Sequence, residues 1–373
     1  MNRVIYEIDA SQLKKKYLEL FRLDAMNKDW KVIKAHLKKK KCVPKNIEEI
    51  LIADASNLVD MYQKYIAFKV DKKTEEKIKK LFDYNKYQPL IAKFLMDPNN
   101  GLKMHTCHYC NTAYINAYGL GNIYKTKLDF IKNARKEELI NYIKTGNKCI
   151  SEGTADRIIA KRDKINTLDD FDKLTCWRKP KKSDSIELSS FNHFDLDHVL
   201  GKAACPILSL SLYNFVPSCQ VCNQKLKKDK TIGDSNNAAL LLKLNPVNPQ
   251  YDFDANVEFK IIPESGSSTY NFEENLENYK LDIYCKDADY EASVSLFKLR
   301  ERYNYHKAVA LRLLDLKERY ADGNITMISN LLQSNNCCKN KYTEEQIKED
   351  LFEIKSSKQN HRCFDKLKRD ILK

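Results

Sequence analysis

Apolar residues in the first hundred positions recur at spacings of three and four, with Lys and Glu between them. This period is typical of amphipathic helices whose apolar stripe packs on a core. The clearest stretches are SQLKKKYLELFRLDAM from Ser11, IEEILIADASNLVDMYQKYIAF from Ile47 and TEEKIKKLFDYNKYQPLIAKFLMD from Thr74, the last of which we expect to break at Pro89. We therefore predict a helical N-terminal region over residues 1–100, which acts as scaffold or docking surface.

The hydrophobic pattern changes several times in the rest of the chain. Residues 101–120 contain the alternating run TAYINAY, which predicts a strand. Residues 236–290 hold the alternating runs VEFKII and YKLDIY between turns rich in Pro, Asn and Gly, which predict short strands. The spacing over 291–320 predicts one strong amphipathic helix, and the spacing over 343–373 predicts more helix. The pattern favours an α+β fold that is mostly helical, with a helical C-terminal region over 291–373.

Residues 121–190 are expected to form an insertion. The runs KEELINYI, TADRIIAKRDK and NTLDDFDKL predict three helices, the first two joined by the turn-rich segment KTGNKCISEG. This order resembles the helix-hairpin-helix element of DNA-binding proteins, in which a glycine-rich hairpin presents backbone N–H groups to a phosphate. Cys149 and Ser151 stand at the two hairpin glycine positions, so DNA contact and a pure packing role stay open as alternatives. The basic loop CWRKPKKSD at 176–184 is a candidate for contacts with a nucleic-acid backbone.

The charge balance favours a polyanionic partner. Lys and Arg outnumber Asp and Glu by 65 to 51, which gives a formal net charge of +14. Because lysine is spread through the whole chain, charge alone favours nucleic acid only weakly. No apolar run approaches the ~18 residues that a membrane span needs, and the N-terminus lacks a signal pattern. We expect a cytoplasmic protein with no membrane partner, in whose reducing surroundings paired cysteines indicate metal before disulfide.

Two Cys-x-x-Cys pairs stand far apart in the sequence. They comprise Cys107, Cys110, Cys219 and Cys222. Four thiolates in two such pairs predict a closed, tetrahedral and structural Zn²⁺ site. We expect the neighbouring His105 and His108 to be spectators, because four cysteines already complete the tetrahedron. The other eight of the twelve cysteines lack partner spacing and are expected to be small buried or surface residues.

The stretch FNHFDLDHVLGKAACPILSLSLYNFVPSCQVCNQKLKK at 191–228 carries further chemistry. Asp197 and His198 form an acid–imidazole pair, Asn214 follows an apolar loop, and Asn223 comes directly after the second cysteine pair. At these residues the sequence resembles the HNH nuclease family, the ββα-metal superfamily, with Asn where the family name has its last His. The resemblance implies an HNH ββα-metal core over 191–235, built from a strand, a variable loop, a second strand and a helix.

The resemblance also implies a role for each residue. Asp197 and Asn223 would hold a catalytic Mg²⁺ or Mn²⁺, since one carboxylate and one amide oxygen suffice once a substrate phosphate joins. His198 would take a proton from the attacking water, and Asn214 would hold the loop and orient His198. Asp195 matches an acidic position that supports either the ion or the strand. Three lysines of the following helix are expected to bind flanking phosphates: Lys225, Lys227 and Lys228.

The overall layout points to a function class. In order, we predict a helical region (1–100), a first zinc knuckle (101–120), the insertion (121–190), the HNH core (191–235), short strands and turns (236–290) and a helical region (291–373). This layout resembles the HNH proteins of bacterial antiphage defence, the HNH subunit of Septu-type systems in particular. It implies a metal-dependent endonuclease, with DNA favoured as substrate and an ATPase as gating partner. The alternatives are a non-catalytic zinc module that binds nucleic acid or protein, and a ribonuclease that cuts tRNA or other structured RNA.

Overall fold

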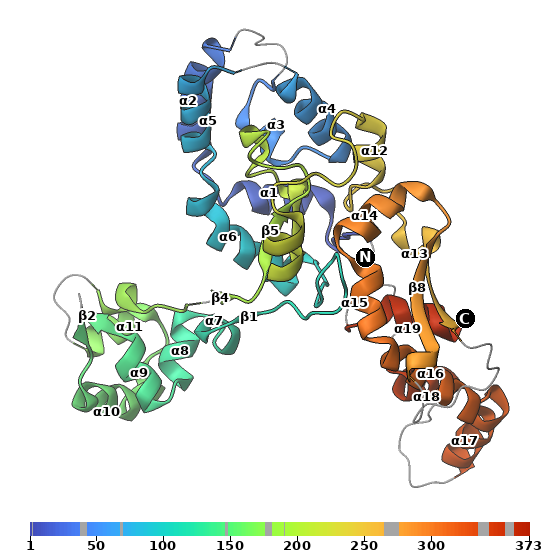
Figure 1. Ribbon diagram of the computed structural model, residues 1–373. Helices are drawn as coiled ribbons and strands as arrows, with labels where there is room; N and C mark the ends of the chain where they lie inside the picture. The colour runs from blue at the N-terminus through green and yellow to red at the C-terminus, as the bar shows by residue number, and fades with distance from the viewer. Residues whose placement is uncertain are drawn as a thin grey trace. The chain divides into compact units, whose positions relative to one another are not determined.

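The computed structural model describes residues 1, 3–37, 43–67, 70–145, 148–175, 181–189, 191–264, 276–334, 343–354 and 362–373. Within these ranges the chain divides into two compact units (Figure 1). Unit 1 comprises Met1–Ile115 and Phe194–Lys373, and unit 2 comprises Asn116–His193. Each unit has an apolar core of its own.

Some sequence predictions concern residues outside the described ranges. They are four cysteines without partner spacing (Cys42, Cys176, Cys337 and Cys338) and residues 176–180 of the predicted basic loop. Of the rest of that loop, Lys182–Ser185 form a short 3₁₀ turn. Across the described part of the chain, no helix is long and apolar enough to cross a bilayer.

The described residues form a mixed α and β fold, made mostly of helices with small two-stranded antiparallel sheets. The predicted α+β class is confirmed at this level. The N-terminal helices are α1 (Ala10–Leu18), α2 (Leu23–Ala35), α3 (Ile47–Leu51), α4 (Ala55–Ile66), α5 (Lys72–Leu81) and α6 (Tyr84–Met96). Four of them begin where an aspartate side chain accepts a hydrogen bond from a free backbone N–H. These capping residues are Asp9, Asp54, Asp71 and Asp83.

The predicted break at Pro89 is wrong, because Pro89 lies inside α6. The chain turns earlier, at residues 82–83, where Asp83 caps α6. Proline removes one hydrogen bond to the carbonyl four residues before it, here that of Asn85. Beyond that gap Ile91 and Leu95 are fully buried, and packing of the apolar face sustains the helix despite the lost bond.

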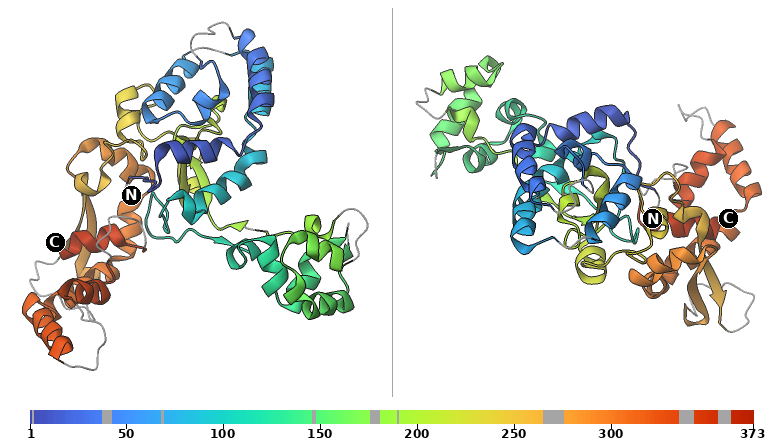
Figure 2. Two further views of the ribbon diagram at one scale, coloured as in Figure 1. Left: turned by 180° about the vertical axis from the view of Figure 1, so that it is seen from behind. Right: turned by 90° about the horizontal axis from the view of Figure 1, so that it is seen from above.

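A hairpin with a long connection lies at the centre of unit 1. Strand β5 (Asp195–His198) pairs antiparallel with β6 (Phe215–Ser218), and the π-helix η7 (Val221–Lys227) follows. The connection contains two short 3₁₀ turns, Pro206–Leu208 and Leu212–Asn214. Helices α3, α4 and α5 pack on these turns (Figures 1 and 2). The N-terminal helices therefore form the frame of the hairpin loop.

Unit 2 is a small helical body. Its helices are α7 (Leu120–Ile123), α8 (Lys127–Asn133), α9 (Lys136–Tyr142), α10 (Glu152–Ala160) and α11 (Leu168–Leu174). Strand β2 (Lys144–Thr145) pairs with β3 (Lys148–Cys149) between α9 and α10, and β1 (Ala117–Tyr118) pairs with β4 (Phe191–Asn192). The order from α9 onward is helix, hairpin, helix, short helix, around a core that contains Phe130, Leu139 and Phe171.

The C-terminal part of unit 1 is a hairpin covered by helices. Strand β7 (Val257–Pro263) pairs antiparallel with β8 (Tyr279–Cys285). The helices here are α12 (Ala238–Lys243), α13 (Phe253–Asn256), α14 (Glu291–Leu296), α15 (Leu299–Tyr305), α16 (Lys307–Arg319), α17 (Asp322–Ser334), α18 (Glu344–Phe352) and α19 (Asp365–Leu372). Helices α15, α16 and α19 pack on the hairpin (Figure 2).

The single helix predicted over 291–320 is wrong, because this segment forms α14, α15 and α16. Lys298 has a φ of 52°, the left-handed conformation that ends a helix. A second break falls at His306, directly before α16. The apolar period continues across both breaks, so periodicity alone does not reveal them.

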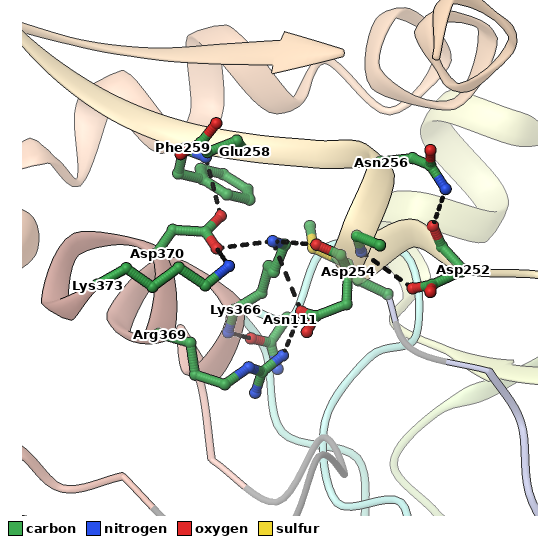
Figure 3. A network of polar contacts seen from close by, with 12 residues as sticks. Asn111, Asp252, Asp254, Asn256, Glu258, Phe259, Lys366, Arg369, Asp370 and Lys373 are labelled. Carbon is green, nitrogen blue, oxygen red and sulfur yellow. Dashed lines mark hydrogen bonds and ion pairs between the residues drawn. The ribbon is translucent and has the colours of Figure 1, made fainter. Parts of the chain in front are cut away.

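Buried charges attach α19 to the rest of unit 1 (Figure 3). Lys366 Nζ lies 2.8 Å from Asp370 Oδ1, and both side chains are fully buried. The second Asp370 oxygen accepts the backbone N–H of Phe259 in β7 at 2.9 Å. Asn111 Oδ1 accepts the backbone N–H of Lys366 at 3.3 Å. The last helix is therefore joined both to β7 and to the turn that carries the first cysteine pair.

Asp370→Ala is expected to lower the free energy of unfolding by about 3–5 kcal/mol, because it leaves the buried Lys366 ammonium with only its longer carboxylate contact, to Asp254 at 3.5 Å, and removes the acceptor of the Phe259 N–H. The matched control is Asp60→Ala, which removes another pair four residues apart, Asp60 with Lys64, whose side chains are about half exposed. An exposed pair of this kind is worth about 0.2–1 kcal/mol. Urea unfolding of both variants measures the difference, and equal losses would contradict the assignment.

Candidate active site and metal centre

Four cysteines meet in one cluster. Cys107 and Cys110 lie on a tight turn between the paired residues Thr106 and Tyr114, Cys219 follows β6, and Cys222 lies in the first turn of η7. Their sulfur atoms all lie within 4.8 Å of one another. Cys110 Sγ and Cys219 Sγ are 3.9 Å apart.

This spacing fits a tetrahedral metal site. Zn–S bonds of about 2.3 Å at tetrahedral angles place neighbouring sulfurs about 3.8 Å apart, whereas a disulfide needs about 2.05 Å. The predicted grouping of the two pairs is thus confirmed, and the cluster could hold a metal ion such as zinc. Among the described residues, the ligand group contains the four cysteines and neither His105 nor His108.

Two side chains donate hydrogen bonds to the cluster sulfurs, one from α15 and one from the turn that carries Cys107 and Cys110. Arg302 of α15 donates from Nη1 to Cys222 Sγ at 3.2 Å, and Thr112 donates to Cys110 Sγ at 3.2 Å. Hydrogen bonds from the neighbouring thiols, and then the charge of Arg302, hold the pKa of Cys110 far below its usual range. Positive charge beside the sulfurs suits a tetrathiolate, which carries a net negative charge around Zn²⁺.

A polar cavity of about 450 Å³ lies beside the β5–β6 hairpin. It is lined by residues of β5, of the loop after β5, of η7 and of α6. Strand alternation predicts opposite faces for Asp197 and His198, yet both line this cavity together with Asp195 and Asn223. The structure therefore gathers the predicted acid, base and amide residues around one space.

Asp197 is buried and fully engaged. Its Oδ1 lies 3.0 Å from Lys227 Nζ, and both side chains are at most 3% exposed. Its Oδ2 accepts a hydrogen bond from the Tyr109 hydroxyl. Burial raises the pKa of the Asp197 carboxyl, and Lys227 and Tyr109 act in the opposite direction.

The predicted phosphate contact of Lys227 does not fit this geometry. Its ammonium points inward, to Asp197 and to the carbonyl oxygen of His198 at 2.7 Å. Asn223 and Lys227 stand four residues apart in η7, so their side chains share one helix face, and each contacts an aspartate of β5. Lys225 and Lys228 are exposed, and of these two only Lys228 lines the cavity.

Asn223 pairs with Asp195, the carboxylate that the sequence assigned only a supporting part. Asn223 Nδ2 donates to Asp195 Oδ2 at 3.1 Å. Both side chains are only partly buried and both line the cavity. Of the two aspartates, Asp195 is therefore the one that directly contacts the amide.

The ring of His198 is held by one hydrogen bond and one aromatic contact. Its Nε2 lies 3.0 Å from the carbonyl oxygen of Ser209, which can only accept, so Nε2 carries the proton and Nδ1 has a free lone pair. The Tyr84 ring packs edge-on at 4.8 Å between ring centres. Burial lowers the pKa of His198 to about 3, so the ring is neutral at pH 7.

Asn214 lies in the frame of the site and not in its cavity. Its side chain accepts the backbone N–H of Leu200 at 2.8 Å and donates to the carbonyls of Leu200 and Leu208 at 3.0 and 3.1 Å. These three bonds close the base of the loop that carries Ser209. Asn214 thus acts on His198 only through the loop.

Several residues of the cavity wall were not identified from the sequence, among them three of α6 and one lysine. Tyr84, Asn85 and Gln88 come from α6, and Lys202 comes from the loop after β5. Their spacing carries no motif, because α6 reaches the hairpin only through tertiary packing. The arrangement joins carboxylates, an amide and a neutral imidazole beside a metal-binding cluster, a donor set suited to hydrolysis at phosphorus. The chain matches no family model, no curated protein and no solved structure.

Proposed function

We propose that this protein is a metal-dependent HNH endonuclease that hydrolyses phosphodiester bonds of nucleic acid, with DNA favoured. The observation that carries the proposal is the meeting of His198, Asp197, Asp195 and Asn223 on one polar cavity. The order of strand, loop, strand and helix supports it, as does the cysteine cluster at the start of that helix. Zinc is the metal we assign to the cluster, in a structural role.

The oxygen ligands of a catalytic Mg²⁺ or Mn²⁺ would come from Asp195, Asp197 and Asn223. Rotation of the Asn223 amide would present its oxygen beside Asp195. Tyr109 and Lys227 fix the Asp197 carboxylate, as hydrogen-bond partners orient ligands at metal sites, and leave it lone pairs for an ion. Such an ion supplies stabilisation of negative charge on the phosphate and on the leaving oxygen.

His198 performs the proton transfer. Its Nδ1 accepts a proton from a water molecule while Nε2 stays bonded to Ser209. The resulting hydroxide forms the new P–O bond, and the bond to the leaving oxygen breaks. The negative charge of a bound phosphate beside the ring would raise the pKa of His198 and so strengthen the base.

One observation favours a second candidate, a non-catalytic zinc module that binds nucleic acid or protein. Both oxygens of Asp197 already have protein partners, which suits a carboxylate with a purely structural role. A ribonuclease with the same residues acting on tRNA is a variant of the first proposal, because the chemistry at phosphorus is shared. By the same resemblance we propose an antiphage effector gated by an ATPase partner.

One assay separates these functions. Purified protein is incubated with plasmid DNA, a single-stranded oligonucleotide or tRNA, each with Mg²⁺, with Mn²⁺ or with EDTA. We expect cleavage of DNA that depends on the added metal. Cleavage of tRNA alone would identify a ribonuclease, and retention of nucleic acid without cleavage in any lane would favour the binding module. Addition of a co-expressed neighbouring ATPase tests the gating.

A further inference from the structure

The cavity wall made by α6 and Lys202 has no part in the proton transfer described above. We infer that this wall binds the substrate strand: Lys202 contacts a phosphate next to the cleaved bond, and the Asn85 and Gln88 amides contact the adjoining nucleotide. The inference rests on the proposed nuclease function and assigns to the N-terminal helical region a substrate-binding role.

Lys202 is a cation held at the cavity without a carboxylate partner. Its Nζ lies 4.1 Å from the centre of the Tyr84 ring, and the aromatic face attracts the ammonium without neutralising it. Among the described residues Lys202 takes part in no ion pair within 4.0 Å. Partial burial lowers its pKa, against the effect of Asp229. Because this ammonium is only partly solvated, binding of a phosphate would stabilise its charge.

Lys202 also lies close to the reacting group. Its Tyr84 partner packs against His198, and the charge of Lys202 is among the causes that lower the His198 pKa, after burial. A phosphate that is close enough to react with a water molecule bound to His198 would therefore also lie close to Lys202. Lys227, by contrast, is already bound to Asp197.

The charged residues that line the cavity balance one another. Its charged lining residues are Lys202, Lys227, Lys228, Asp195, Asp197 and Asp229. Three cations and three anions sum to zero with His198 neutral, so protein charge alone does not attract a phosphodiester. A bound divalent cation would change the net charge of the lining to +2. Of the three lysines, Lys202 is the one that packs on Tyr84, next to His198.

The amides complete the wall. Asn85 and Gln88 stand three residues apart on α6, so they share one face of the helix, and both line the cavity. Each offers an N–H₂ donor and a carbonyl acceptor, which suit sugar and base edges without charge. The wall is held in place because the Tyr84 hydroxyl donates to the carbonyl of Leu196 in β5 at 3.3 Å.

The first test measures steady-state cleavage of whichever nucleic acid the wild-type protein cuts. Lys202→Met keeps the length of the side chain over Tyr84 and removes the charge. We expect KM to rise by about 10-fold, the loss of one hydrogen bond to a charged group, with kcat changed far less. Lys202→Arg should retain most of the affinity, and Gln88→Ala should raise KM with unchanged thermal stability. The control is Lys93→Gln, an exposed lysine of α6 that does not line the cavity.

The second test measures the salt dependence of binding with a His198→Asn background, which binds without cutting. Adding Lys202→Met should reduce the slope of log Kd against log salt by about 0.9 for duplex DNA, and adding Lys93→Gln should not. If the wild-type protein cuts but Lys202→Met leaves both KM and the salt slope unchanged, the substrate-binding role of this wall is rejected and the proposed nuclease function is retained. If the wild-type protein neither cuts nor binds nucleic acid, both proposals fall.

Discussion

His198→Asn is expected to reduce kcat by about 10²- to 10⁴-fold, the usual contribution of a general base. Asn replaces His here in preference to Ala because His198 is buried between the rings of Tyr84 and Phe215, where Ala would leave a cavity. Nucleic-acid binding should persist, since His198 is neutral and makes no phosphate contact in the proposed mechanism. The measurement is single-turnover cleavage with Mg²⁺, alongside a binding isotherm.

A second variant is Asn214→Ala, which removes hydrogen bonds of the Ser209 loop and is expected to affect cleavage only through the position of that loop. We expect it to lower the free energy of unfolding, because its three bonds are buried. Cleavage at wild-type rate by His198→Asn would show that another group accepts the proton and that the catalytic assignment is wrong.

The stability of the protein should depend on pH through His198. Burial lowers the pKa of His198 to about 3 in the folded protein, whereas the unfolded value is about 6.5. Between these values the unfolded state binds the proton and the folded state does not, so stability falls as pH drops through this window. For the same reason, kcat/KM should show no acid limb from His198 near pH 6.5. Unfolding titrations of wild type and His198→Asn at several pH values measure the difference.

Cys222→Ser is expected to have the largest effect on stability. Binding of structural zinc is worth about 10–16 kcal/mol in zinc-finger peptides at pH 7, and here the cluster joins two segments far apart in the chain, with Arg302 of α15 as a third contact. Cys222 is fully buried and accepts a hydrogen bond from Arg302. Loss of the metal would therefore loosen the turn at Cys107, the start of η7 and the contact of α15 together.

Elemental analysis and urea unfolding test this expectation. The wild-type protein should carry one Zn²⁺ per chain and should lose stability when a chelator removes it, and Cys219→Ser should behave like Cys222→Ser. Cys205→Ser is the control, because Cys205 is equally buried but lies outside the cluster. Freshly purified wild-type protein without bound metal, or equal losses for Cys205→Ser and Cys222→Ser, would reject the metal assignment.

Local spacing was sufficient for part of the site. Two Cys-x-x-Cys pairs predict a shared cluster because each pair must sit on a tight turn and four sulfurs satisfy one tetrahedral ion. The strand assignments at β5 and β6 follow from alternation, and the helices α1 to α6 follow from a period of three and four. These features depend on neighbours in the sequence, which a pattern records.

Helix ends were less predictable. Pro89 does not break α6, since the buried face of the helix outweighs one missing hydrogen bond, while Lys298 ends a helix although no proline or glycine marks the place. In both cases tertiary packing overrides the local preference.

The sequence by itself determined the mostly helical class and the grouping of the four cysteines, and it singled out Asp197, His198 and Asn223, which the structure brings to one cavity. Only the tertiary structure decided how their charges are paired. Lys227 stands thirty positions from Asp197, and Tyr109 stands eighty-eight positions away, yet both bind its carboxylate, while α6 supplies Tyr84 beside His198. A buried charge requires a partner wherever the fold can provide one, and sequence spacing does not identify a partner that approaches from another element.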